Sequence, residues 1–190
     1  KAFGRDTSLY DSSFGWRFIN PKMEELYGTE GMGETAENLA EKYNISREDQ
    51  DKFAAWSHLK SFTAQESGVL SEEIIPVRIP QRKSDDIIFS KDEFIKPTTN
   101  VDVLAKLRPA FRKGGTVTAG NSSGLNDGAA ATLIASEYAV KEFNLTPKAK
   151  IVASGVAGVE PKYMGIGPVY ASIIALKKAG LTLADMDIIE

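Results

Sequence analysis

The sequence has no cysteine and only one histidine among its 190 residues. The lack of cysteine excludes disulfides, thiolate metal sites and a cysteine nucleophile within these residues. The histidine, His58, stands beside Ser57 on a predicted helix, and no nucleophile–carboxylate arrangement can be traced around it. We interpret His58 as a lone surface histidine. Any mechanism that needs a catalytic histidine must take it from outside these residues.

Long apolar runs and an excess of positive charge are also missing. No run approaches the ~18 residues that a membrane-spanning helix needs, and no secretory signal opens the chain. The formal net charge of −3 argues against a surface dedicated to nucleic acid, whereas an apolar content of 42% can supply a core. These observations predict a cytoplasmic protein that binds neither membranes nor nucleic acid.

The two ends of the chain predict that it is a piece of a longer protein. It starts at Lys1, and residues 187–190 have the pattern of the first half of a buried strand. Natural termini seldom cut a core strand, because the backbone groups of its partner would be left unpaired.

A glycine-rich stretch, residues 114–131, stands out from the rest: GGTVTAGNSSGLNDGAAA. Glycine allows positive φ and close backbone approach, while asparagine, aspartate and serine bond their own backbone in tight turns. Residues 116–118 predict a strand before the turn, and the apolar run 129–135 predicts another after it. The turn is interpreted either as a tight connection between strands or as a loop that presents main-chain donors to a ligand.

The first part of the chain predicts helices and a small hairpin. Caps and stop signals place helices at 21–26 after Asn20, at 35–43 capped by Thr35, at 47–66 after Ser46, and at 101–107 after Asn100. Residues 74–79 and 86–89 predict two strands, the first an edge strand because of Pro76 and Pro80. Phe14, Trp16 and Phe18 alternate as in a half-buried strand or an arm packed on a neighbour.

Two side-chain groupings in this first part have competing interpretations. Apolar residues at helical spacing on the 47–66 helix predict a core face rather than the alternative, a cofactor site: Phe53, Trp56, Leu59 and Phe62. The most basic part of the chain predicts a solvated face or, alternatively, a site for a polyanion such as a nucleotide phosphate: Lys96, Lys106, Arg108, Arg112 and Lys113.

From residue 126 onward strands and helices alternate. The predicted order is a strand at 129–135, a helix at 136–143 ending near Asn144, a strand at 150–157, a helix from Pro168 to Gly180, and the strand at 187–190. This alternation predicts an α/β fold.

Several motifs together resemble the thiolase family. Residues 115–128, GTVTAGNSSGLNDG, resemble the family block GTVTAGNASGxNDGA, and residues 163–168, YMGIGP, resemble its xMGxGP turn. Residues 35–38, 46–50 and 104–111 fit the family in the same order, so the resemblance covers essentially the whole chain. One further segment, residues 14–21, is similar to the β-ketoadipyl-CoA thiolase subgroup.

The resemblance implies a thiolase fold fragment, with a helix-rich loop domain followed by part of a layered αβαβα core. Residues 1–125 would form the CoA-binding loop domain, with residues 1–20 as an assembly arm. Residues 126–148 would be the last strand and helix of the N-terminal half, and residues 149–190 the start of the C-terminal half. The implied assembly is a homodimer or homotetramer.

The resemblance also implies the chemistry. Thiolases cleave a 3-oxoacyl-CoA with CoA, or condense two acyl-CoA molecules, through a cysteine nucleophile, a histidine and a second cysteine. None of these residues lies in this chain, so we expect no catalytic residue here and CoA binding only. CoA is a substrate, and no metal or other cofactor is expected. The substrate is a 3-oxoacyl-CoA, with 3-oxoadipyl-CoA favoured. The alternatives are a short-chain acetoacetyl-CoA thiolase and a non-catalytic CoA-binding module.

The resemblance assigns CoA contacts residue by residue. Ser123 would bond the pantetheine amides, Lys96 would lie beside the adenine nucleotide, and the other contacts would line the pantetheine channel or the acyl tunnel: Ala110, Phe111, Ala119, Gly124, Leu125, Met23, Met32 and Met164. Met suits an apolar wall that adapts to its ligand, although each methionine could equally fill a core. Two positions depart from the family: Gly31 replaces the histidine of biosynthetic thiolases, and Val103 replaces a serine near CoA.

Overall fold

The computed structural model describes residues 4, 5, 9, 11 and 15–190. The chain divides into two compact units, which we describe separately. One unit is Met32–Asn126, and the other joins Lys1–Gly31 to Asp127–Glu190. Phe14 of the predicted alternating arm lies outside the described residues. Trp16 and Phe18 are exposed and belong to no strand, because the described residues offer them no pairing partner.

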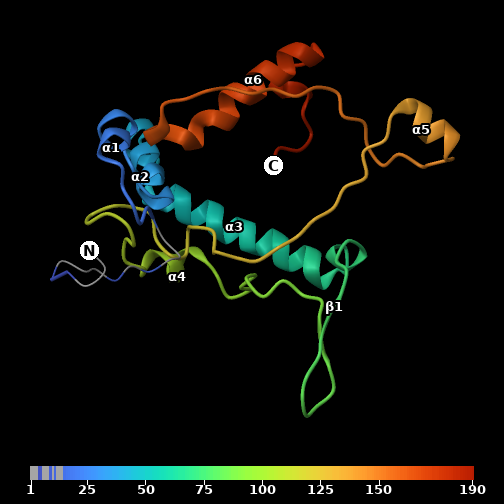
Figure 1. Ribbon diagram of the computed structural model, residues 1–190, viewed down its shortest axis with the longest axis horizontal. Helices are drawn as coiled ribbons and strands as arrows, with labels where there is room; N and C mark the ends of the chain where they lie inside the picture. The colour runs from blue at the N-terminus through green and yellow to red at the C-terminus, as the bar shows by residue number, and fades with distance from the viewer. Residues whose placement is uncertain (1–3, 6–8, 10, 12–14) are drawn as a thin grey trace. The chain divides into compact units, whose positions relative to one another are not determined.

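Unit 32–126 is built on the long helix α3 (Figure 1). Its elements are α2 (Met32–Tyr43), α3 (Arg47–Glu66), a 3-10 turn η1 (Leu70–Glu72), β1 (Val77–Ile79), β2 (Ile87–Phe89) and α4 (Val101–Ala105). The predicted caps of α3 and α4 are confirmed. The Ser46 hydroxyl accepts a hydrogen bond from the Asp49 amide, and the Asn100 side chain accepts one from the Val103 amide.

The start of α2 differs from the prediction. The helix begins at Met32, so Thr35 is an internal residue rather than the cap. Its hydroxyl donates a 2.8 Å hydrogen bond to the Met32 carbonyl, the back-bonding that threonine makes inside a helix. Threonine can cap a helix or bond to a backbone carbonyl inside it, so the residue type alone did not locate the start of α2.

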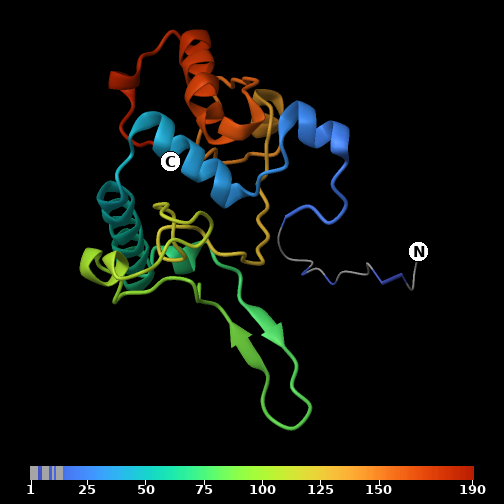
Figure 2. The same cartoon turned by 90° about the vertical axis from the view of Figure 1, so that its left-hand side faces the viewer.

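The hairpin β1–β2 is confirmed, but its strands are shorter than predicted. Val77 pairs with Phe89 and Ile79 with Ile87, antiparallel. Pro76 and Pro80 flank β1 and have no N–H to donate, which limits the ladder to the residues between them. The hairpin extends away from α3 in both views (Figures 1 and 2), and both of its strands are exposed.

The centre of this unit is largely polar. Among the described residues its buried apolar side chains are Ala40, Leu104 and Val117, and its buried polar ones are Thr35, Glu37, Asp51 and Thr118. The predicted core face of α3 is wrong for three of its four residues, because Phe53 is 66% exposed, and Trp56 and Leu59 are also exposed. Helical spacing shows which side chains share a face, but not whether another segment covers that face.

The segment 116–118 is not the strand that the sequence predicts. Its single pairing is an isolated antiparallel bridge between Pro109 and Thr118. All three amides of this segment donate to side chains of Glu37 and Asn121, which take the place of a neighbouring strand.

The other unit contains α1 (Pro21–Tyr27), α5 (Glu137–Glu142), η2 (Pro161–Ile166), α6 (Gly167–Ala179) and η3 (Leu183–Asp185). The predicted helix ends are confirmed. Asn20 and Ser136 accept hydrogen bonds from the first turns of α1 and α5. Asn144 has φ 50° after α5, and Gly180 is left-handed at the end of α6.

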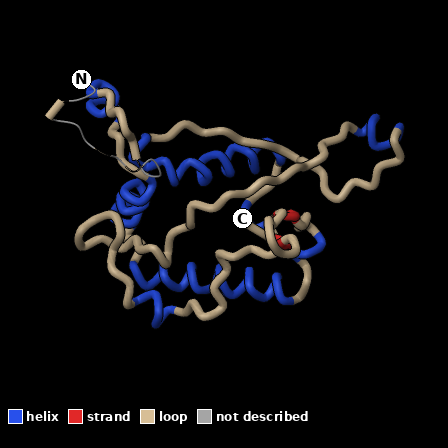
Figure 3. The backbone as a smooth tube through the Cα atoms, turned by 60° about the horizontal axis from the view of Figure 1, so that its bottom comes forward, coloured by secondary structure: helices blue, strands red, loops and turns tan. Residues whose placement is uncertain are grey.

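The three strands predicted after residue 126 are not formed in the described structure. Residues 129–135, 150–157 and 187–190 belong to no helix or strand. In Figure 3 long stretches of tan loop tube connect the helices. Leu133 is 82% exposed. A strand needs a hydrogen-bonded neighbour, and these residues find none among those described.

One feature of an α/β layer is nevertheless present in this unit. The backbone of Gly155 packs directly on α6, where an added Cβ would overlap the carbonyl of Ala171. The Lys178 ammonium also donates a 3.0 Å hydrogen bond to the Ser154 carbonyl. The segment predicted as a strand therefore lies along the helix that the α/β pattern assigns to it. No helix in the described part of the chain is long and apolar enough to cross a membrane.

Candidate functional site

The glycine-rich loop is fixed to helix α2 by a buried carboxylate. Glu37, 3% exposed, accepts hydrogen bonds of 2.8 Å from the amides of Thr116 and Val117, and one of 3.1 Å from the Thr116 hydroxyl. Burial raises the pKa of the Glu37 carboxyl. The hydrogen bonds from Val117 and Thr116, together with the positive charge of Arg112, outweigh burial and hold the pKa below its ordinary value of 4.5.

Arg112 attaches the start of the same loop to α2. Its guanidinium contacts Glu34 at 2.8 Å, Asn38 at 2.6 Å and Glu41 at 3.4 Å, which lie along one face of that helix. At this residue neither interpretation of the basic stretch holds. The charge is used in an internal ion pair, because α2 supplies acidic side chains at helical spacing opposite it.

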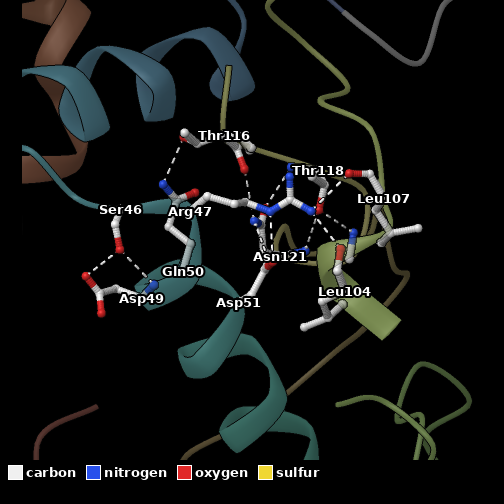
Figure 4. A network of polar contacts seen from close by, with 12 residues as sticks. Ser46, Arg47, Asp49, Gln50, Asp51, Leu104, Leu107, Thr116, Thr118 and Asn121 are labelled. Atoms are coloured by element: carbon white, nitrogen blue, oxygen red, sulfur yellow. Dashed lines mark hydrogen bonds and ion pairs between the residues drawn. The ribbon is translucent and has the colours of Figure 1, made fainter. Parts of the chain in front are cut away.

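A second buried carboxylate fixes the loop to α3 (Figure 4). Asp51 is 1% exposed and forms a 2.8 Å ion pair with Arg47, one helical turn earlier. Its other oxygen accepts a 2.9 Å hydrogen bond from the Asn121 side-chain amide. Arg47 also donates to the carbonyls of Leu104 and Leu107, so one guanidinium joins α3 to the end of α4.

An open groove of about 720 Å³ runs along α3 beside this loop. Its walls come from one face of α3, from residues 92–95 and from the loop itself. Apolar rings and small polar groups alternate in it: Phe53, Phe94, Ser57, Ser61, Ser122 and Ser123. A mixed lining of this kind suits a ligand with an apolar body and dispersed amide or hydroxyl groups.

His58 lies in the same groove and is not the lone surface histidine predicted. Its Nδ1 accepts a 3.2 Å hydrogen bond from the Lys96 amide, and its ring lies 5.9 Å from that of Phe94, centroid to centroid. The sequence does not indicate this contact, because Lys96 comes 38 residues after His58. Among the described residues no serine hydroxyl is hydrogen-bonded to His58, so the groove holds no serine–histidine pair.

The structure brings part of the predicted site to the groove. Ser123 lines it. Gly124 lies against Phe94, whose ring would be 2.7 Å from an added Cβ. Lys96 adjoins the groove, because its backbone amide donates a hydrogen bond to His58 Nδ1. Ala119 and Leu125 belong to the same loop and are exposed, but they do not line the groove.

Three other predicted contacts lie elsewhere in this unit. The Ala110 amide donates to the Val117 carbonyl, and the Phe111 ring packs on Gly33 of α2. Met32, 71% exposed, begins that helix. Met23 and Met164 are partly exposed and belong to the other unit, so their relation to the groove stays a prediction.

Comparison with known proteins decides the family. The N-terminal domain of thiolases matches residues 10–138, and the C-terminal domain of thiolases matches residues 145–190. This chain belongs to the thiolase family. The resemblance drawn from the glycine-rich stretch is therefore confirmed, whereas the finer limits at 125, 126–148 and 149–190 stay a prediction.

Curated relatives match most or all of this thiolase chain. It is 49% identical over 189 residues to the beta-ketoadipyl-CoA thiolase of Acinetobacter baylyi, and 50% identical over 189 residues to the 3-oxoadipyl-CoA/3-oxo-5,6-dehydrosuberyl-CoA thiolase of Escherichia coli. These matches include 100% of this chain and 47% of each relative. The acetyl-CoA acetyltransferase of Thiocystis violacea is 55% identical over 159 residues, 84% of this chain and 40% of the relative. The thiolase chain thus spans about half the length of these relatives.

Solved structures confirm the fold class. The Bacillus anthracis acetyl-CoA acetyltransferase matches with a TM-score of 0.81 and 44% identity, over 95% of this chain and 48% of that one. The human mitochondrial 3-ketoacyl-CoA thiolase matches with a TM-score of 0.79 and 49% identity, over 84% and 40%. The helix-rich unit with its small sheet is thus part of a thiolase fold.

Sequence reasoning missed the residues that hold the thiolase loop in place. Glu37 and Asn121 lie in segments that fit the family, and Asp51 directly follows such a segment, but the sequence indicates no role for any of the three. One local signal was available for Asp51, because Arg47 precedes it by four residues on a helix. Nothing local indicates that Glu37 accepts from residues about eighty positions later.

Proposed function

We propose that this chain is the CoA-binding part of a thiolase that acts on a 3-oxoacyl-CoA, with 3-oxoadipyl-CoA as the favoured substrate. The observation that carries the proposal is the 49–50% identity, over the whole chain, to relatives named for that substrate. The reaction breaks the bond between C2 and C3 of the 3-oxoacyl chain. C2 takes up a proton and leaves in acetyl-CoA, while the thiol sulfur of a second CoA becomes bonded to C3.

CoA is a substrate in this proposal, and no prosthetic group takes part. Three features support a CoA site beside the glycine-rich loop. Ser123 lies in the groove wall, and Gly124 packs against Phe94. The backbone amide of Lys96 donates a hydrogen bond to His58. Ser123 presents a hydroxyl that can bond a pantetheine amide. Ala110, Phe111, Ala119, Leu125, Met23, Met32 and Met164 remain proposed contacts of the same ligand.

The groups that form and break bonds would come from the rest of the complete protein. Covalent acyl transfer needs a thiolate, and none of these 190 residues is a cysteine. The one histidine holds the Lys96 amide through Nδ1. We assign this chain the binding and placement of CoA, with catalysis assigned to residues beyond it. A homodimer or homotetramer in the cytoplasm, assembled through residues 1–20, stays a prediction.

Two other functions remain as alternatives. A short-chain acetoacetyl-CoA thiolase is favoured by the 55% identity to the Thiocystis violacea enzyme, while Gly31, at the position of the biosynthetic histidine, counts against it. A non-catalytic CoA-binding module is the other alternative, which the lack of cysteine in these 190 residues leaves open. The gene sequence on either side separates this module from an enzyme, since an enzyme requires a cysteine block and a Gly-His-Pro block there.

The test is an assay of the full-length gene product with CoA and three substrates: acetoacetyl-CoA, a longer 3-oxoacyl-CoA and 3-oxoadipyl-CoA. We expect the highest kcat/KM with 3-oxoadipyl-CoA. Turnover of acetoacetyl-CoA alone would select the short-chain alternative. CoA binding without turnover of any of the three would select the non-catalytic module.

A further inference from the structure

The loop that presents Ser123 has no regular secondary structure to hold its shape. Apart from the bridge at Thr118, residues 114–126 contain no strand or helix. A ligand-contacting loop gains precision when its backbone is fixed by side chains of rigid elements. The residues that do this here are Asn121 and Thr118.

Asn121 ties two points of the loop to α3 with a single side chain. Its amide nitrogen donates 2.9 Å to Asp51 and 3.1 Å to the Thr116 carbonyl, and its carbonyl oxygen accepts 2.7 Å from the Thr118 amide. Figure 4 shows Asn121 between Asp51 and Thr118. Both N–H donors and the acceptor are in use, which fixes the orientation of the side chain.

Thr118 holds the next turn of the loop. It is fully buried, and its hydroxyl accepts hydrogen bonds of 3.2 Å and 3.3 Å from the amides of Gly120 and Asn121. Gly120 packs so closely on Leu104 and Leu107 that an added Cβ would overlap Leu107. Ser123 follows three residues later, so its place in the groove wall depends on this turn.

The partner of Asn121 is itself held in place. Asp51 is buried and forms a 2.8 Å ion pair with Arg47. Arg47 is fixed by the carbonyls at the end of α4. The chain of contacts therefore runs from α4 through Arg47 and Asp51 to Asn121, and every member is hydrogen-bonded.

We propose that Asn121 and Thr118 are positioning residues that set the backbone conformation in which Ser123 meets CoA. The consequence for CoA binding rests on the proposed function, whereas the fixing of the loop does not. Asn121→Asp would bring a second carboxylate to the 2.9 Å contact with Asp51 and remove both donors. Thr118→Val keeps the shape but removes the acceptor from two buried amides.

The first measurement is amide hydrogen exchange of the full-length gene product, which needs no activity. In Asn121→Ala and Thr118→Val we expect the amides of residues 118–124 to exchange about tenfold faster, while those of α6 keep their rates. Thr118→Ser retains the hydroxyl and should match the wild type. Unchanged exchange in both disruptive variants would overturn the proposal.

The second measurement is the KM for CoA and kcat with the best substrate. Asn121→Ala and Thr118→Val should raise the KM for CoA about tenfold and change kcat much less, as expected from the loss of roughly one or two hydrogen bonds. Thr118→Ser should restore the wild-type KM. Equal losses in kcat and in kcat/KM, with no change in KM, would contradict a role in placing CoA.

Ala40→Gly is the control that separates a general loss of stability from a specific effect on CoA binding. It weakens α2 at a buried position that has no contact with CoA in the proposed site. This variant should unfold at lower temperature and keep its KM for CoA. The same rise in KM in Ala40→Gly would attribute the effect to stability and overturn the proposal. If the wild type turns over none of the substrates, the proposed function fails, and the exchange result still decides whether these residues fix the loop.

Discussion

The carboxylate of Glu37 in α2 accepts a 2.8 Å hydrogen bond from the amide of Val117, eighty residues later in the chain. The same carboxylate also accepts from the amide and hydroxyl of Thr116. One buried side chain thus satisfies backbone groups that would otherwise need a neighbouring strand. The glycine-rich loop is therefore held to the helices by charge-assisted hydrogen bonds rather than by a sheet.

Glu37→Gln should lower the free energy of unfolding by about 2 kcal/mol, since hydrogen bonds to a charged acceptor contribute ~1.5–3 kcal/mol. Chemical denaturation at pH 7 measures it. Glu41→Gln is the matched control on the same helix, because Glu41 makes a single exposed 3.4 Å contact with Arg112. The control should change stability by less than about 0.5 kcal/mol. Equal losses in the two variants would contradict a special role for Glu37.

The Glu37 contacts also predict a pH dependence. The pKa of this carboxyl is lower in the folded state than its ordinary value of 4.5, so the unfolded state binds more protons between the two values. Its contribution to stability is therefore complete above about pH 4.5 and is lost as the pH falls through the folded pKa. The stability difference between wild type and Glu37→Gln should shrink over that window in denaturation curves. A difference that grows on acidification would contradict the depressed pKa.

Arg47→Ala should destabilise the protein by about 3–5 kcal/mol, because it leaves the buried carboxylate of Asp51 without its counter-charge. Lys52→Ala is the control, since it breaks an ion pair of the same helical spacing with Glu48, in which both side chains are exposed. That change should cost less than about 1 kcal/mol. Thermal unfolding of both variants measures the two losses of stability. Similar losses would contradict a larger contribution from the buried ion pair.

Gly33→Ala should cost about 1–3 kcal/mol of stability, because its Cβ would overlap the Phe111 ring and force the ring to move. Gly31→Ala, with open space around the added Cβ, should cost less than about 0.5 kcal/mol. Urea denaturation of the two variants tests this. A Gly33→Ala variant as stable as Gly31→Ala would mean that the ring of Phe111 does not pack on α2.

Ser123→Ala should weaken the use of CoA by the full-length gene product by the equivalent of one lost hydrogen bond, about 1 kcal/mol or a fivefold rise in KM. Ser84→Ala, in the exposed turn of the hairpin, is the control and should leave KM and kcat unchanged. Steady-state kinetics with varied CoA make the comparison. Wild-type KM and kcat in Ser123→Ala would remove this serine from the site.

The sequence by itself determined the features that local chemistry controls. Asn20, Ser46, Asn100 and Ser136 cap helices as predicted, because a side-chain oxygen two or three residues from an unpaired amide needs no distant partner. The two prolines around β1 limited the hairpin for the same kind of reason. The motif of residues 115–128 likewise sufficed to indicate the thiolase family, which the domain matches confirm.

The tertiary structure alone decided which polar groups are buried and what covers each apolar face. Glu37, Asp51 and Asn121 look like ordinary polar residues in the sequence, and their roles depend on contacts across about 70 to 80 residues. Phe53 has the spacing of a core residue, yet it lines an open groove. Segment 129–135 has the pattern of a strand and stays unpaired. In each case the outcome depends on whether another part of the chain supplies a partner, and periodicity in one segment carries no information about that.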